Sequence, residues 1–220
     1  MKKIISLVLC LVLGCFVLAG CSNGSEPFEE RSYTPDMTVN KINLDVQDRE
    51  IEVSLSPDEQ VHMQYSENSK EYYEISVSDD RVLIMTSASN KEWTDYIGFK
   101  PAAKDRKISL QIPNAQLENL TLSTTNEDIT LSELAVAGSI SLSSNGGNIT
   151  FGTLDVGNAL TLSAKNGDIS GAIMGSYDDF AIQSKIKKGE SNLPSKKDSG
   201  EKTLTVSNNN GNIDIEFVSE

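Results

Sequence analysis

Cysteine and histidine are scarce in this chain, and their scarcity excludes several kinds of site. The 220 residues include three cysteines and one histidine. Cys10 and Cys15 lie in an N-terminal hydrophobic run, so Cys21 is the one cysteine that follows it. No pair of cysteines and histidines is therefore expected to hold zinc. A disulfide framework is excluded too, and the fold must be stabilised by its own core. The sequence predicts no metal site and no cofactor.

Basic residues are outnumbered by acidic ones. The chain has 19 lysines and arginines against 32 aspartates and glutamates, a formal net charge of −13. This excess argues against nucleic acid as a partner, because binding to phosphate requires a basic surface. It also argues against adsorption to anionic lipid. Attachment to a membrane would have to come from covalently bound acyl chains.

Further absences argue against an enzyme and against helical structure. No Gly-x-Ser-x-Gly elbow is present in residues 38–220, and His62, between the apolar Val61 and Met63, has no partner base in the pattern. The turns also lack the Gly-Gly-x-Gly-x-Asp repeat that binds calcium. After residue 20, no window keeps a 3.6-residue apolar period over three turns, so we expect essentially no helix. The sequence predicts a non-catalytic protein.

The N-terminus has the organisation of a secretory signal. Two lysines precede an apolar run over residues 4–17, which is too short for a permanent membrane span. The run ends in Leu18-Ala19-Gly20-Cys21, which resembles the lipobox of bacterial lipoproteins. That resemblance implies cleavage between Gly20 and Cys21, a diacylglyceryl group on the Cys21 thiol and an acyl chain such as palmitate on the new amino terminus. The alternative is an ordinary signal peptide with a chance cysteine. We expect a lipid-anchored protein on the extracytoplasmic face of the cell membrane.

Three segments follow from this organisation. Residues 1–20 are the signal peptide, residues 21–37 a lipid anchor and flexible tether, and residues 38–220 one domain. Period-2 alternation begins in this domain and predicts half-buried strands. A hairpin turn is expected at Asp79-Asp80. The predicted strands centre on residues 42–46, 51–55, 61–65, 73–77, 82–84 and 108–112.

A repeat dominates the rest of the domain. Residues 120–131, 140–151, 160–171 and 204–215 align without gaps, and the first three start 20 residues apart. In each repeat, two leucine, isoleucine or valine positions alternate with serine and threonine. We therefore predict an all-β fold: a single-stranded parallel β-helix, or solenoid, with about 20 residues per coil. A third inward pair at 134/136 and 154/156 predicts three strand faces per turn, and the N-terminal strands would form the first coils or a cap. The alternative is a hairpin meander with type I′ turns.

Each repeat has a corner rich in asparagine, aspartate and glycine. These residues tolerate the positive φ that a sharp corner needs. Asp128 and Asp168 occupy the same column two coils apart, which at ~4.8 Å per coil is about 10 Å. That is slightly wide even for the carboxylate pair of an inverting glycosidase. A polysaccharide lyase or hydrolase therefore remains the alternative to a structural corner. The predicted corner residues are Asn126, Asp128, Asn145, Gly146, Asn148, Asn166, Gly167, Asp168, Asn210, Gly211 and Asn212.

Two other features have both a structural and a functional interpretation. Phe180 and Ile182 fall one period after Leu160 and Leu162, and residues 187–202 then form a lysine-rich extruded loop. This loop is either simply solvated or a contact for an anionic wall polymer. An aromatic group either stacks on a sugar or closes the open end of the solenoid. Its members are Tyr65, Tyr72, Tyr73, Trp93, Tyr96 and Phe99.

A family resemblance rests on several segments together. They are INLDVQDREIEVSL, RVLIMTS, KISLQIPNAQLENLTLSTTNEDITLSEL and the N-G-(D/N)-I corners at 166–169 and 210–213. Over about residues 39–219 the chain resembles the bacterial "putative adhesin" domain family and the LiaG-type envelope proteins that carry this domain. The resemblance implies a β-solenoid outside the membrane, often linked to envelope-stress signalling. We expect a binding or scaffold protein of the cell envelope. Its expected partners are the membrane, through the anchor, and cell-wall glycan or a membrane signalling protein, of which it would be an accessory subunit.

Overall fold

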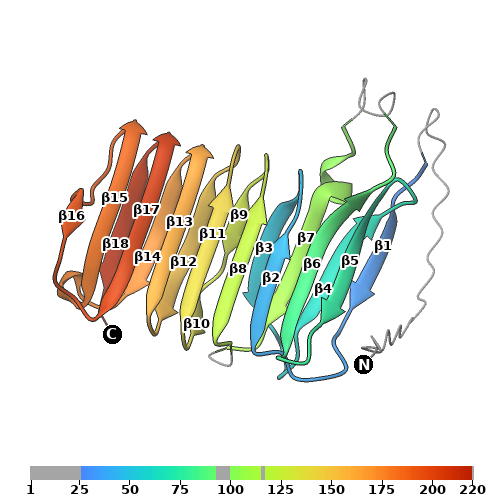
Figure 1. The fold of residues 1–220 in the computed structure, drawn as a ribbon, viewed down its shortest axis with the longest axis horizontal. Coiled ribbons are helices and arrows are strands. Elements are labelled where there is room, and N and C mark those ends of the chain that lie inside the picture. Colours follow the sequence, from blue (N-terminus) through green and yellow to red (C-terminus); the bar gives the residue numbers. More distant parts are fainter. Residues whose placement is uncertain (1–25, 93–99, 115–116, 220) are drawn as a thin grey trace, which may run out of the picture.

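The computed structural model describes residues 26–92, 100–114 and 117–219. In these residues the chain is all-β, as predicted, and strands stack side by side along one long axis (Figure 1). The helical residues described are two short 3₁₀ turns, η2 (Ala103–Arg106) and η3 (Tyr177–Asp179). Neither they nor any other described helix has the length and apolarity needed to cross a membrane.

The strands form two facing sheets. The first, called sheet A, has the order β1-β4-β7-β3-β9-β12-β14-β18, with β10 paired to β12. The second, called sheet B, has the order β16-β15-β17-β13-β11-β8-β2-β6-β5. The bounds in sheet A are β1 (Glu29–Tyr33), β3 (Glu50–Leu55), β4 (His62–Glu67), β7 (Lys107–Ile112), β9 (Ile129–Leu131), β10 (Leu134–Val136), β12 (Ile149–Val156), β14 (Ile169–Met174) and β18 (Ile213–Val218). Those in sheet B are β2 (Lys41–Asp45), β5 (Glu71–Val77), β6 (Val82–Ser89), β8 (Asn119–Thr124), β11 (Ser139–Ser144), β13 (Ala159–Asn166), β15 (Phe180–Lys188), β16 (Lys196–Lys197) and β17 (Lys202–Asn210).

The core lies between the two sheets and is built from the predicted apolar columns. In sheet B, Leu120, Ile140 and Leu160 lie opposite one another in parallel ladders, each 20 residues from the next. These side chains are fully buried because successive residues of a strand point to opposite faces. Parallel pairing of identical columns excludes the hairpin meander for the repeats.

The prediction of three strand faces per turn is wrong. The pair expected on a third face, Leu154 and Val156, lies in the same strand as Ile149, which was expected on the second. Gly152 and Thr153 lie between Ile149 and Leu154 and continue β12, because no asparagine or aspartate corner interrupts that stretch. Each coil therefore contributes to two sheets, and both pairs are buried against the same core.

The stacking order differs from the chain order at both ends. The first coil, β2 with β3, lies between β6 with β7 on one side and β8 with β9 on the other. At the other end, β17 lies between β13 and β15, and Leu204 pairs directly with Leu160. The expectation that Ile182 follows Leu162 in the stack is therefore wrong, since Ile182 pairs with Leu204 one strand further out. Figure 1 shows this exchange as red β17 between the orange strands.

Three pairs among the N-terminal strands are antiparallel, and one of them, β5 with β6, is a hairpin. The predicted hairpin at Asp79-Asp80 is confirmed, because β5 and β6 pair antiparallel and Arg81 adopts a φ of 59°. The proposed flexible tether is wrong for residues 29–33, which form β1 on β4. This strand reads EERSY and has Tyr33 as its single apolar residue, so no period-2 alternation marks it in the sequence.

Candidate functional site

The predicted corner residues form a hydrogen-bond ladder along the stack. Asp128 Oδ1 accepts the backbone N–H of Asn148 at 2.7 Å, and Asn148 Oδ1 accepts that of Asp168 at 2.8 Å. Asp168 Oδ1 then accepts the N–H of Asn212 at 2.7 Å, and Asn212 Oδ1 that of Glu190 at 2.9 Å. Aspartate and asparagine thus have the same role here, as acceptors for the next coil.

A second ladder uses the asparagines that begin the corners. Asn166 Nδ2 donates to the carbonyl of Asn145 at 3.1 Å, and Asn210 Nδ2 donates to Asn166 Oδ1 at 2.7 Å. Asn126 Nδ2 donates to Asp48 Oδ1 in the coil before it. The glycines of the last two corners, Gly167 and Gly211, have positive φ values of 121° and 134°, whereas the φ of Gly146 is not positive.

This arrangement bears on the alternative of a carbohydrate-active enzyme. The carboxylates of Asp128 and Asp168 accept backbone N–H groups, and Asn148 occupies the position between them. Within the described ranges, no group of three or more histidine, cysteine, aspartate or glutamate side chains is placed to hold a metal ion. The two aspartates therefore serve the backbone, and their geometry assigns them no reaction.

A column of buried polar side chains accompanies the corners. Thr124 Oγ1 donates to the carbonyl of Arg49 at 2.7 Å, and Ser144 Oγ donates to that of Glu127 at 3.0 Å. Asn208 Nδ2 donates to the carbonyl of Gly167 at 2.9 Å. Each bond satisfies a corner carbonyl of the neighbouring coil, as buried polar groups require. Among the described buried side chains, Asn208 Oδ1 is the polar atom without a partner.

The lysine-rich segment 187–202 is not an extruded loop. It folds back over the end of the stack, where Leu193 is buried and β16 pairs antiparallel with β15. The Asn192 amide bonds to both the N–H and the carbonyl of Ile215 and so covers the outer edge of β18. Lys197 Nζ donates to the carbonyl of Phe180 at 2.9 Å, so this lysine holds the segment in place.

Other lysines lie on the free part of an edge strand. Lys185, Lys187 and Lys188 of β15 are exposed, beyond the stretch that β16 covers. Lysine on an open edge discourages pairing with other strands. Protection of this edge is therefore a structural role for these three lysines.

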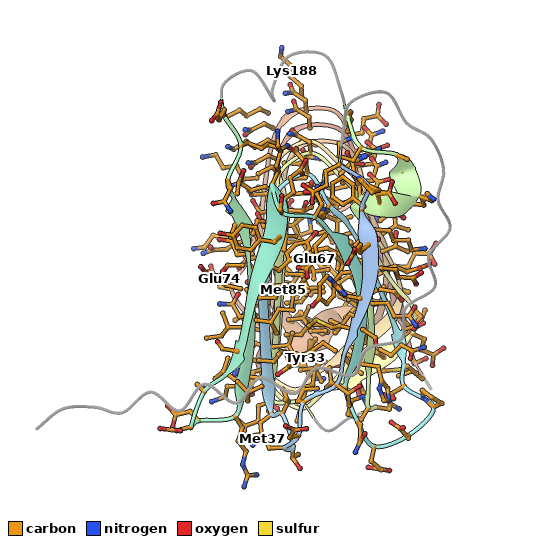
Figure 2. The ribbon with its side chains drawn as sticks, turned by 90° about the vertical axis from the view of Figure 1, so that its right-hand side faces the viewer. Tyr33, Met37, Glu67, Glu74, Met85 and Lys188 are labelled. Atoms are coloured by element: carbon orange, nitrogen blue, oxygen red, sulfur yellow. The ribbon has the colours of Figure 1, made fainter. Side chains whose placement is uncertain are left out.

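The aromatic group is divided by the structure. Tyr65 and Tyr73 meet edge to face between the sheets, with their ring centroids 5.2 Å apart. Tyr33 packs against the same end of the core, as the end-on view shows (Figure 2). Tyr72 is on the opposite face of β5, within 3.5 Å of Asn90 Oδ1. The remaining members, Trp93, Tyr96 and Phe99, lie outside the described residues, as do Gly20 and Cys21.

Beside these rings lies a buried ion network that the sequence did not reveal. Arg49 is 4% exposed, and its Nε donates to the Tyr73 hydroxyl at 2.6 Å while Nη2 donates to Glu71 at 2.8 Å. Lys91 Nζ lies 2.6 Å from the other oxygen of Glu71. Burial acts to raise the pKa of Glu71, but the hydrogen bonds from Lys91 and Arg49 outweigh it and hold that pKa below its usual value. The network joins β5 to the first coil.

His62 contacts partners that the sequence pattern did not suggest. Its Nε2 lies 2.9 Å from Asp58 Oδ1, and its Nδ1 lies 2.9 Å from the Thr34 hydroxyl. Asp58 also accepts the Ser56 hydroxyl and the Gln60 N–H, bonds that close the turn after β3. Because Asp58 and Thr34 are exposed, this set pins a surface turn to the segment after β1.

The outer face of sheet B carries an unbroken row of uncharged polar side chains. Its members lie opposite one another on six neighbouring strands, and we call them the central row. Within the described part of the chain, none of these side chains forms a hydrogen bond to another protein group. They differ in this from the corner ladders, which are used to hold the backbone. The central row comprises Asn43, Thr121, Ser141, Thr161, Thr205 and Gln183.

The outer face of sheet A is different in charge. Its corresponding row runs from Glu52 through Thr130, Thr150 and Ser170 to Asp214, so it is acidic at both ends. The central row of sheet B has no charge along its length. On a chain with a net charge of −13, the central row is thus an extended neutral strip, with Lys41, Asp45 and Lys185 beside it on the same face.

Comparison with known proteins places the fold. Residues 39–177 match the family model described as Toastrack DUF4097. The match ends shortly before β15 begins. None of the curated proteins is a detectable sequence relative of the chain.

One solved structure supports the fold, and the fold alone. The crystal structure of a "putative cell adhesion protein" from Clostridium sporogenes superposes with a TM-score of 0.60 at 10% identity, covering 87% of this chain and 100% of that one. A "putative adhesin" from Bacteroides fragilis gives a TM-score of 0.35 at 14% identity, covering 87% of this chain and 98% of that chain. A "putative lipid binding protein" from Parabacteroides distasonis gives 0.28 at 10% identity, covering 90% and 96%.

Proposed function

The chain belongs to the Toastrack DUF4097 family, as its repeats led us to expect, and from this premise we propose that it is a lipid-anchored, non-catalytic binding protein of the cell envelope. Cys21 would carry the lipid and hold the domain on the extracytoplasmic face of the membrane. The N-terminal strands β1, β4 and β5 would close one end of a solenoid with about 20 residues per coil. The segment 187–202 would close the other end.

The observation that carries the binding role is the central row of sheet B. Its six side chains have donors and acceptors that the fold does not use, whereas the corner and core polar groups are bonded to backbone. An extended surface of this kind suits repeated polar contacts with an envelope polymer. The aspartates of the corners serve the backbone, which favours binding over catalysis.

The anchor is tested by comparing Cys21→Ala with Cys10→Ala. We expect Cys21→Ala to lose incorporation of labelled palmitate and to leave the membrane fraction. The control, which changes a cysteine inside the hydrophobic run, should keep both properties. A Cys21→Ala protein that remains labelled and membrane-bound would contradict the anchor.

The binding surface is tested with detergent-washed cell walls. The full-length protein in detergent micelles should sediment with these walls, and Thr161→Arg in the central row should weaken this binding. Thr150→Arg makes the same change at an exposed position of sheet A and serves as the control. Equal binding by both variants would rule out the central row as the contact surface.

A further inference from the structure

The central row defines the kind of ligand as well as the surface, an inference that rests on the proposed function. We propose that sheet B binds an extended, uncharged polysaccharide chain that lies across the strands along the central row. The argument uses the chemistry of the row, its charge, its repeat and the hollow at its end.

The chemistry of the row matches that of sugar hydroxyls. Serine and threonine hydroxyls each offer one donor and two acceptor sites, and the amides of Asn43 and Gln183 offer both kinds of group. Thr161, Thr205 and Gln183 are exposed, and the protein itself uses none of their hydrogen-bonding capacity in the described residues. A ligand rich in hydroxyl groups would accept hydrogen bonds from the donors of the row and donate hydrogen bonds to its acceptors.

The charge of the row selects against anionic polymers. No lysine or arginine belongs to the central row, and the chain as a whole carries a net charge of −13. A polyanion would meet repulsion from the net charge, and the nearest lysines of this face, Lys41 and Lys185, lie beside the two ends of the row and not in it. A neutral polysaccharide is not repelled by the net charge and needs no cation in the row.

The composition of the row also argues against a protein partner. The cores of protein interfaces are enriched in aromatic residues, methionine and arginine and depleted in serine. The central row contains four hydroxyl and two amide side chains and none of the enriched types. Its surface lacks the anchor residues from which protein interfaces draw most of their energy.

The geometry of the row favours a polymer over a small molecule. Six neighbouring strands at a spacing of ~4.8 Å give a row about 24 Å long, with similar chemistry at each step. Such a row presents repeated contacts to a chain of several pyranose rings. Small-molecule sites, in contrast, are concave and largely apolar.

One end of the row leads into a hollow that gives the site a boundary. The hollow has a volume of about 250 Å³, and its polar lining is Gln183, Thr203 and Thr205 of the sheet with Lys197 of β16 and Asp198 after it. Lys197 fixes this wall through its bonds to the carbonyls of Phe180 and Ser199. The hollow would receive the end of the polysaccharide chain, because the folded-back segment stands beside the row there.

The test uses the full-length protein in detergent micelles and the β-linked hexamer of N-acetylglucosamine, with its trimer for length and polygalacturonate as the anionic comparison. By calorimetry we expect the hexamer to bind, the trimer to bind at least about tenfold more weakly, and polygalacturonate not to bind. Thr161→Arg should weaken hexamer binding about tenfold, because the larger side chain blocks the middle of the row. Thr150→Arg should bind like the unchanged protein.

Two results would overturn the inference. One is binding of polygalacturonate in preference to the hexamer, and the other is equal hexamer affinity for the Thr161→Arg and Thr150→Arg proteins. Failure of the hexamer to bind, while washed cell walls still bind in a manner sensitive to Thr161→Arg, would reject the neutral polysaccharide and leave the proposed function standing. If neither the hexamer nor the washed cell walls bind, both the neutral polysaccharide and the proposed function are rejected.

Discussion

Asn208 shows how a single buried amide serves the stack. Its Nδ2 satisfies a corner carbonyl, while its Oδ1 has no partner although the residue is 1% exposed. The equivalent residues of earlier coils are Thr124, Ser144 and Ala164, of which the first two donate to the same kind of carbonyl. Where the residue in this column is polar, its side chain donates a hydrogen bond to a corner carbonyl of the neighbouring coil.

We predict that Asn208→Asp lowers the free energy of unfolding by about 2–4 kcal/mol at neutral pH. The isosteric change removes the donor to Gly167 and places a carboxylate in the core. Burial would raise the pKa of the new carboxyl, so the loss should shrink as pH falls and the acid becomes a neutral donor. Urea unfolding at several pH values measures this.

Asn209→Asp is the matched control for this prediction. Asn209 is the next residue of β17 and points to the opposite face, and its side chain forms no hydrogen bond to any described residue. Its replacement should change the free energy of unfolding by less than about 0.5 kcal/mol. Similar losses in the two variants would show that charge alone, and not the buried donor, is responsible.

Tyr65 supplies a prediction for alkaline conditions. Burial, with a smaller effect from Glu67, raises the pKa of Tyr65 to about 12 from its usual 10.0. The folded state therefore holds the phenol proton more tightly, and this contribution is complete below pH 10 and lost as pH rises toward 12. Tyr65→Phe should reduce the fall in stability above pH 10. Urea unfolding between pH 8 and pH 11.5 tests it.

The same variant should behave normally at pH 7. The Tyr65 hydroxyl forms no hydrogen bond to any described residue, so its removal leaves no unpaired group. An alkaline limb identical to that of the unchanged protein would indicate that other groups control the loss of stability at high pH.

The corner ladder is the feature that matters at the scale of the element. Its acceptors alternate between aspartate and asparagine while the bond to the next coil stays the same. What is required is an oxygen at a fixed place, and not a charge. This distinguishes a structural corner from a catalytic carboxylate, for which loss of ionisation abolishes function.

We predict that Asp168→Asn changes the free energy of unfolding by less than about 0.5 kcal/mol, whereas Asp168→Ala lowers it by about 1–2 kcal/mol. Asparagine keeps the acceptor for the Asn212 N–H, and alanine removes it. Thermal and urea unfolding of both variants provide the comparison. A large loss in Asp168→Asn would mean that the carboxylate charge itself stabilises the corner.

The open edge of β15 yields a second prediction at this scale. Replacement of Lys185, Lys187 and Lys188 by threonine should cause concentration-dependent aggregation, because it leaves an uncharged strand edge exposed. Light scattering over time measures the effect. The control replaces three lysines elsewhere (Lys41, Lys104 and Lys165) and makes the same change in net charge. Aggregation of both triple variants would assign the effect to charge and not to the edge.

The elements also show how far the sequence could predict the fold. The buried columns through Leu120, Ile140 and Leu160 follow from local alternation and spacing, and they were predictable. The exchange that places Leu204 beside Leu160 depends on which of two similar strands, β15 or β17, docks there. The 20-residue spacing alone favours β15, which is nearer to β13 in the sequence. Alignment of the whole repeat favours β17, which is farther away in the sequence. The central row was visible as a Ser/Thr pattern, but its continuity across six strands needed the register.

At the scale of the whole molecule, net charge is the dominant electrostatic feature. Ion pairs at the surface contribute little, so the −13 charge should act mainly through self-repulsion in the compact state. We predict that the free energy of unfolding rises from 10 mM to 150 mM NaCl, as the Debye length falls from ~30 Å to ~8 Å. Urea unfolding at each salt concentration measures it. KCl should give the same increase, and a rise confined to one salt would point to ion binding in place of screening.

The exchanged coils at the two ends have a consequence for the order in which the molecule can form. A chain that emerges from its N-terminus presents β15 before β17, yet β17 lies between β13 and β15. The strand β17, which follows β15 in the chain, must therefore take the inner position between β13 and β15. Likewise the first coil must wait for β6 and β8 before both its sides are paired. This end of the stack therefore forms only after β17 has been synthesised. A product truncated before β17 cannot form it.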